Sequence, residues 1–184
     1  MTELSLNILD VAQNSIKAKA TLIKISIVAD TKADTLGITI SDNGCGMSKD
    51  QLAKVEDPFF TTRTTRKVGL GVSFFKLAAE TAGGNFHITS ALEEGTTVTA
   101  SFILSNIDRI PLGDITSTIH ALVTFNQHID FLYVYRVDDR EFELDTREFR
   151  KILGDVPFDL PDVSNYIKEY LKENKTEVDQ EVIF

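Results

Sequence analysis

Two pairs of alternating apolar stretches, each joined by a short polar turn, constrain the fold of this chain more than any other feature. The segments "TLIKISIVA" (21–29) and "TLGITIS" (35–41) alternate apolar and polar residues, which predicts two strands joined by the turn "DTKAD". The segments "NFHITSA" (85–91) and "TTVTASFIL" (96–104) repeat the pattern around "LEEG". Because strands joined by such short turns pair antiparallel, the sequence predicts two hairpins.

Helical patterns stand before and between these hairpins. Apolar residues recur at helical spacing in "ELSLNILDVAQNSIK" (3–17) and in "GVSFFKLAAETAGG" (71–84), whose glycines mark a helix end. A short helix is predicted at 49–55, capped by Ser48, and the polar stretch 57–68 has no usable period. This order predicts an α+β fold, a two-layer α/β sandwich in which a mixed sheet carries helices on one face.

The C-terminal part reads as further helices and one more hairpin, which are predicted at the following positions: helix 113–125, strands 130–137 and 141–146, and helices 147–153 and 162–174. We therefore divide the chain into a first domain at 1–105 and a C-terminal α/β extension at 106–184. Asp145 and Glu148 are expected to form a capping box. Phe131, Tyr133 and Tyr135 alternate on one strand face and are expected in the core.

Composition excludes several classes of function. A net charge of −9 argues against a general nucleic-acid surface, which would be basic, and a single cysteine excludes an internal disulfide. No apolar run approaches the roughly 20 residues of a membrane span, and the N-terminus has no basic-then-apolar signal. We therefore expect a cytoplasmic protein that binds neither nucleic acid nor membrane.

Three short motifs carry residues that suit a ligand, although each also has a purely structural interpretation. Asp10, Asn14 and Lys17 lie at i, i+4 and i+7 on one stripe of an otherwise apolar helix, where a solvated face would explain them. The hexamer "DNGCGM" (42–47) is either a tight turn or the floor of a pocket. The segment "GLG" (69–71) directly precedes a helix, where backbone N–H groups can approach an anion.

The combination of motifs, in this order, is more specific than any one of them. "DVAQNSIKAKAT" (10–21) and "DNGCGM" resemble the Asn-bearing helix and first glycine box of the GHKL superfamily of ATPases. "DPFFTTR" (57–63) with "GLGVSFFK" (69–76) is similar to the phenylalanine and glycine boxes of its histidine-kinase branch, and "EEGTTVTASF" (93–102) to its closing strand. The resemblance implies the Bergerat (GHKL) fold and ATP with Mg²⁺ as ligands.

The resemblance also implies a role for each matching residue. Asp42 would accept a hydrogen bond from the adenine amino group, and Gly44 and Gly46 would leave room for the base. Thr96 would bond the same region through its hydroxyl, and Met47 would be an apolar wall.

The phosphate end of the nucleotide would lie against the first helix and the lid. Asn14 would hold Mg²⁺ against the triphosphate, with Lys17 nearby. Residues 57–71 would be the ATP lid, with nucleotide contacts from Phe60, Thr61, Arg63, Gly69, Leu70 and Gly71.

Two positions depart from the family pattern. Asp10 stands where hydrolysing members carry a glutamate, so it is the candidate catalytic base with a side chain one methylene shorter. Lys67 stands where the first lid glycine is often found, which adds a cation near the phosphates. Both departures favour slow or absent hydrolysis.

The resemblance leaves three functions open. Little chain precedes the Asn-bearing helix, and none of the three histidines has the acceptor context of a histidine kinase. We therefore expect a stand-alone protein kinase that acts on a separate partner protein, similar to histidine kinases or to anti-sigma-factor kinases. The alternatives are an ATPase that drives a conformational change and a non-catalytic nucleotide-sensing module. The extension either covers an exposed face or serves partner docking, including the formation of a homodimer.

Overall fold

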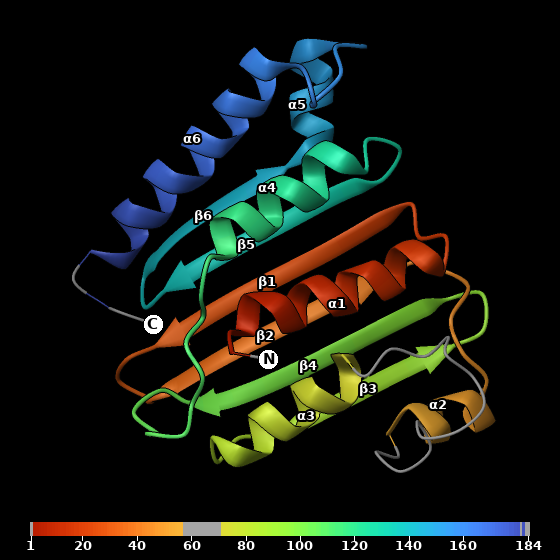
Figure 1. Cartoon of the computed structure of the whole chain (residues 1–184), viewed down its shortest axis with the longest axis vertical. Coiled ribbons are helices and arrows are strands. Elements are labelled where there is room, and N and C mark those ends of the chain that lie inside the picture. The colour runs from red at the N-terminus through yellow and green to blue at the C-terminus, as the bar shows by residue number, and fades with distance from the viewer. Residues whose placement is uncertain (1, 57–70, 181, 183–184) are drawn as a thin grey trace.

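One six-stranded mixed sheet forms the framework of the part of the chain that the structure, a computed structural model, describes: residues 2–56, 71–180 and 182 (Figure 1). The strand order is β3-β4-β2-β1-β5-β6. Neighbouring strands run antiparallel except β1 and β5, which run parallel. The sequence-based prediction of an α+β fold with a mixed sheet is confirmed.

The described elements lie close to the predicted segments. The helices are α1 Leu4–Lys17, α2 Lys49–Glu56, α3 Gly71–Thr81, α4 Ile115–Phe125, α5 Thr146–Leu153 and α6 Pro161–Asp179. The strands are β1 Leu22–Asp30, β2 Thr35–Asp42, β3 Phe86–Ala91, β4 Gly95–Ile103, β5 Asp130–Val137 and β6 Arg140–Asp145. The predicted loop at 57–68 lies outside the described residues.

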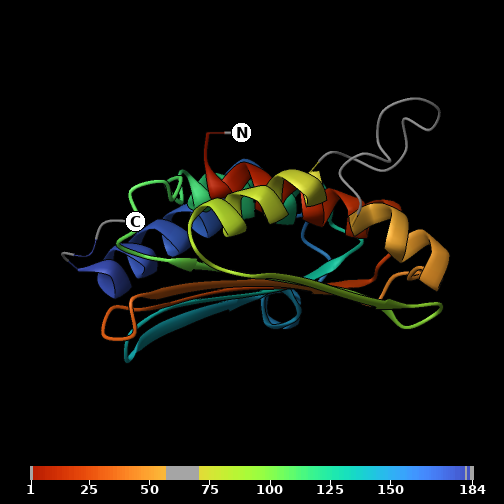
Figure 2. The ribbon, with the colours of Figure 1, turned by 90° about the horizontal axis from the view of Figure 1, so that it is seen from below.

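The long helices α1, α3, α4 and α6 cover one face of the sheet (Figure 2). Alternation along the strands places one row of side chains under these helices, so Ile23, Ile25 and Ile27 of β1 are buried. Phe75 of α3 packs between Phe86 and Phe102, with ring centroids 6.1 and 6.0 Å away. The core therefore lies between the helices and the sheet.

The C-terminal segment extends the same sheet. Strand β5 pairs with β1 from Leu22↔Asp130 to Ala29↔Val137, and Phe131, Tyr133 and Tyr135 are buried, as predicted. The chain between the two halves also touches α1, because the backbone N–H groups of Leu4 and Ser5 donate to the carbonyl oxygens of residues 111 and 112, each at 2.9 Å. These bonds satisfy donors that a helix N-terminus leaves free.

Helix caps form largely where the sequence predicts them. Ser48 Oγ accepts from the Gln51 N–H at 3.3 Å, and Gln51 Oε1 accepts from the Ser48 N–H at 2.9 Å, which is a complete capping box. Asp145 caps α5 through the Arg147 N–H at 2.9 Å. The prediction that Glu148 completes a capping box there is wrong, because its carboxylate instead accepts from Lys151 Nζ at 2.6 Å.

Polar side chains join the end of α6 to the hairpin β5–β6. Tyr135 Oη donates to Asp179 Oδ1 at 2.6 Å, and Lys175 forms an ion pair with the same carboxylate. Arg140 Nε donates to the carbonyl oxygen of Val178 at 2.7 Å. Burial, together with the hydrogen bond to Asp179, raises the pKa of Tyr135 far above its usual value.

Alkaline pH should therefore destabilise the fold in part through Tyr135. Above about pH 10 the folded chain keeps a proton on Tyr135 that the unfolded chain releases, so the free energy of unfolding falls by about 1.4 kcal/mol per pH unit for this group. Tyr135→Phe should remove this contribution and leave that of Tyr133, whose pKa burial also raises. Urea denaturation of both proteins between about pH 9 and 11 measures the slopes. Equal slopes would contradict the assignment.

No helix in the described ranges is long and apolar enough to cross a membrane.

Candidate functional site

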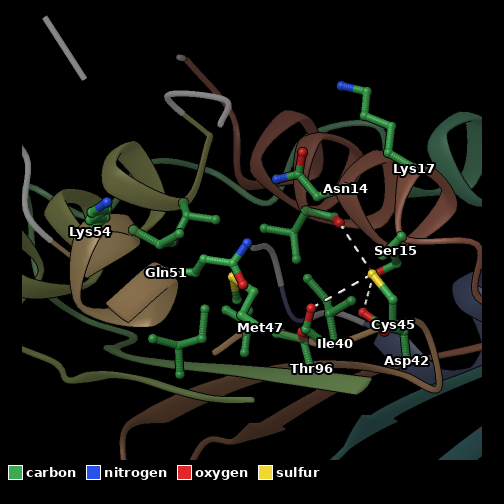
Figure 3. Close-up of a pocket in the computed structure, with 17 residues that line it drawn as sticks. Asn14, Ser15, Lys17, Ile40, Asp42, Cys45, Met47, Gln51, Lys54 and Thr96 are labelled. Atoms are coloured by element: carbon green, nitrogen blue, oxygen red, sulfur yellow. Dashed lines mark hydrogen bonds between the residues drawn. The ribbon is translucent and has the colours of Figure 1, made fainter. Parts of the chain in front are cut away.

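A cavity of about 320 Å³ opens between the C-terminal half of α1, the loop after β2, helix α2 and the inner face of the sheet (Figure 3). Among the described residues, the cavity is lined by Val11, Asn14, Ser15, Lys17, Ala18, Ile40, Asp42, Cys45, Gly46, Met47, Gln51, Lys54, Val55, Val72, Ile88, Thr96 and Val98. Most of these side chains are apolar, and the polar ones lie at the inner end and at the rim. This distribution is typical of pockets for small organic ligands.

Two hydrogen bonds hold the Asp42 carboxylate at the inner end of the cavity. Ser15 Oγ donates to Oδ2 at 2.6 Å, and the Gly44 N–H donates to Oδ1 at 2.8 Å. Since each carboxylate oxygen has two lone pairs, Asp42 retains acceptor capacity for a ligand. The carboxylate is therefore fixed in orientation and still able to accept.

Hydrogen bonds from the Asn43 side chain and from the loop backbone fix the loop 43–47 to its neighbours. Asn43 Oδ1 accepts from the N–H groups of Thr21 and Leu22, each at 2.9 Å, and the Cys45 N–H donates to the Ala18 carbonyl oxygen at 2.9 Å. A Cβ on Gly44 would lie 2.8 Å from the Cβ of Ala18. Residue 44 therefore has to be glycine for the loop to pack against the end of α1.

Gly46 is needed for a different reason. Its φ of +64° is in the left-handed region, and a Cβ there would lie 1.8 Å from the carbonyl oxygen of Ala91. Next to it, the Met47 N–H donates to Ser90 Oγ at 2.9 Å, and Ser90 Oγ lies 2.8 Å from Thr96 Oγ1. The loop is thus fixed to the hairpin β3–β4. Met47 lines the cavity together with Thr96, the partner of Asp42 in the pairing of β2 with β4.

Asn14 and Lys17 lie at the rim of the cavity, on the stripe of α1 that the sequence predicts (Figure 3). Asp10 and Gly71 meet at the start of α3, where a Cβ on residue 71 would lie 2.6 Å from the Cβ of Asp10. These two residues are not among the described residues that line the cavity. Asn7, on the same side of α1, is fully buried and lines a separate cavity with Phe74.

The structure thus brings six of the predicted site residues to one cavity: Asn14, Lys17, Asp42, Gly46, Met47 and Thr96. Gly44 lies directly beside it. The predicted lid contacts at Phe60, Thr61, Arg63, Gly69 and Leu70 lie outside the described residues. Sequence reasoning did not single out Ser15, Gln51 or Lys54, and only for Ser15 was there a signal, a polar residue on the buried face of α1.

The side chains at the cavity also show whether the expected Mg²⁺ fits this site. In the described ranges no cluster of three or more histidine, cysteine or acidic side chains could hold an ion. A single Asn14 oxygen at the rim still fits Mg²⁺, because this ion takes few protein ligands and completes its shell with water and phosphate oxygens. The residues present therefore fit a metal that arrives with a phosphate ligand.

Comparison with known proteins identifies relatives of this chain. Residues 2–106, more than half of the chain, match the family model "Histidine kinase-, DNA gyrase B-, and HSP90-like ATPase".

Curated relatives include a sensor protein and a sporulation kinase. The chain is 34% identical over 93 residues to the C4-dicarboxylate transport sensor protein DctB of Pseudomonas aeruginosa, covering 50% of this chain and 15% of that protein. It is 33% identical over 102 residues to sporulation kinase B of Bacillus subtilis, covering 53% of this chain and 23% of that kinase. The chain thus spans less than a quarter of the length of these relatives.

Solved structures extend the likeness in fold. The Aquifex aeolicus MutL ATPase domain complexed with ADP aligns with a TM-score of 0.52 at 16% identity, covering 98% of this chain and 70% of that one. The N-terminal domain of a DNA repair protein aligns with a TM-score of 0.54 at 18% identity, covering 79% of this chain and 52% of that one.

Proposed function

This chain belongs to the histidine kinase-, DNA gyrase B- and HSP90-like ATPase family, and we propose that it binds Mg-ATP in the cavity beside α1 and acts as a protein kinase on a separate protein. One observation carries the proposal: Asp42, held by Ser15 and Gly44, lies at the inner end of an apolar cavity whose rim bears Asn14 and Lys17.

The inner end of the cavity suits an adenine ring. Ile40, Ile88 and Val98 of the sheet offer an apolar surface to a flat base. Asp42 would accept a hydrogen bond from the adenine amino group, and the Thr96 hydroxyl would bond the same edge. A half-buried carboxylate of this kind prefers a hydrogen-bond donor to the carbonyl oxygen of a 6-oxo purine, which favours adenine.

The rim suits the phosphates. Asn14 would contribute its carboxamide oxygen to Mg²⁺, and the Lys17 ammonium would neutralise phosphate charge. Mg²⁺ held there with the nucleotide would supply positive charge next to the phosphates. Phosphoryl transfer depends mainly on positioning and charge neutralisation, so these side chains supply much of what the chain needs to contribute.

The acceptor in this proposal is a histidine or serine on another protein. The histidines of this chain lie on β3, on α4 and after α4, and the described lining of the cavity includes none of them. His120 is occupied by a hydrogen bond with Ser164, whose Oγ lies 2.9 Å from its Nε2. The similarity to sporulation kinase B of Bacillus subtilis supports a kinase reaction.

A second function, ATP hydrolysis, is favoured by the position of Asp10. This acid lies one turn before Asn14 and packs against Gly71, the residue at which α3 begins. A carboxylate one helical turn from Asn14 would orient a water molecule toward the phosphates.

Purified chain, γ-labelled Mg-ATP and a lysate-derived set of candidate partners separate these functions. Label transferred to a partner, and lost with Asp42→Asn, supports the kinase. Phosphate released by the chain alone, and lost with Asp10→Asn while nucleotide binding persists, supports the ATPase. Tight binding with neither product contradicts both and leaves a nucleotide-sensing module.

A further inference from the structure

We propose that Ser15 is a positioning residue for the recognition of adenine: its hydroxyl fixes the Asp42 carboxylate in the orientation that accepts the amino group of the base. The inference rests on the proposed function, since it assigns a role within the same cavity.

Ser15 is unusual for its place on α1. Ser15 is only 3% exposed and lies on the face of the helix that also buries Val11 and Ala12. An apolar side chain at this position would avoid the free-energy cost of burying a hydroxyl group. The part of it that is exposed lines the cavity. A buried hydroxyl at this position has to be satisfied by a specific partner.

That partner is the Asp42 carboxylate. Ser15 Oγ lies 2.6 Å from Asp42 Oδ2, the short range typical of a hydroxyl that donates to an anion, and 3.4 Å from the Val11 carbonyl oxygen on its own helix. The shorter contact identifies the carboxylate as the acceptor. The bond joins α1 to the end of β2, across 27 residues of chain.

The second donor to Asp42 comes from its own loop. The Gly44 N–H holds Oδ1 at 2.8 Å, so this bond alone would leave the carboxylate free to rotate about one anchored oxygen. With Ser15 on Oδ2, both oxygens are fixed. Each then directs its remaining lone pair along a set direction, and a ligand need not bear the cost of ordering the carboxylate on binding.

This role predicts a loss that is specific to the amino group of the base. Ser15→Ala should weaken Mg-ATP binding about 5- to 30-fold, because the hydrogen bond from adenine then meets a carboxylate that is no longer held. The triphosphate of purine riboside carries hydrogen in place of the amino group and makes no such bond. Its affinity should change less than about 2-fold.

Isothermal titration calorimetry of the full chain with each nucleotide and Mg²⁺ tests the proposal. The variants are Ser15→Ala, Ser15→Cys, Asp42→Asn, and the double variant Ser15→Ala with Asp42→Asn. Cysteine keeps the shape of the serine side chain, with a slightly larger sulfur atom, but donates only weakly. Both Ser15 variants should lose affinity for ATP and keep their affinity for the triphosphate of purine riboside. In the Asp42→Asn background, Ser15→Ala should change ATP affinity less than about 2-fold, because the group that Ser15 positions has been altered.

Equal losses for ATP and the purine riboside analogue would overturn the proposal, since they indicate a general distortion of the cavity. Unchanged ATP affinity in both Ser15 variants would also overturn it, while leaving the proposed function intact. Failure of the wild-type chain to bind ATP would instead overturn the proposed function itself.

Discussion

Replacing Asp42 by asparagine should weaken the binding of Mg-ATP about 10- to 150-fold, which corresponds to the loss of one charge-assisted hydrogen bond of roughly 1.5–3 kcal/mol. The asparagine amide would also point an N–H₂ donor toward either the Ser15 hydroxyl or the Gly44 N–H, both of which donate to the carboxylate in the structure. Isothermal titration with Mg-ATP measures the change.

Asp139→Asn is the matched control for this experiment. Its carboxylate is 93% exposed in the turn between β5 and β6, so the substitution removes the same charge away from the cavity. We expect wild-type affinity in the control and an unchanged circular dichroism spectrum in both variants. Equal affinities of Asp42→Asn and wild type would exclude Asp42 from the nucleotide site.

The second large effect is expected at Gly46. Gly46→Ala should lower the free energy of unfolding by about 2–4 kcal/mol, because it combines a strained positive φ with steric overlap. The new Cβ would lie 1.8 Å from the Ala91 carbonyl oxygen and 3.2 Å from that of Gly95, and both are backbone atoms that a rotamer change cannot move. Nucleotide affinity should fall as well, since residues 45–47 line the cavity.

Gly37→Ala serves as the control for this variant. Gly37 lies in β2, and the nearest atom to a Cβ there is the carbonyl oxygen of Val28 at 3.8 Å, an ordinary contact distance. Urea denaturation should show little or no destabilisation of Gly37→Ala. A Gly46→Ala protein within about 0.5 kcal/mol of wild type would contradict the argument that the loop must approach the hairpin so closely.

Much of the fold could be predicted from the sequence because its signals are local. Strand alternation and turn composition predict both hairpins of the first half, and Ser48 predicts the start of α2, where the structure shows it capping the helix. The pairing of β5 with β1 has no such signal. The two strands are more than 90 residues apart and run parallel, so neither a turn nor a period indicates that they are neighbours.

The candidate site shows the same division. Asp42, Asn14 and Thr96 stand in short motifs whose residue types indicate a nucleotide. Ser15 could not be assigned a partner from sequence, because a serine in a helix is ambiguous and its acceptor is 27 residues away. Gln51 and Lys54 enter the cavity only through the position of α2 relative to the sheet.

A crystal structure of the chain with Mg²⁺ and a non-hydrolysable ATP analogue would test the central claim most directly. We predict the adenine ring between α1 and the inner face of the sheet, with its amino group within hydrogen-bond distance of the Asp42 carboxylate and the triphosphate beside Asn14. An analogue bound elsewhere, or a cavity that stays empty at saturating analogue, would contradict the account.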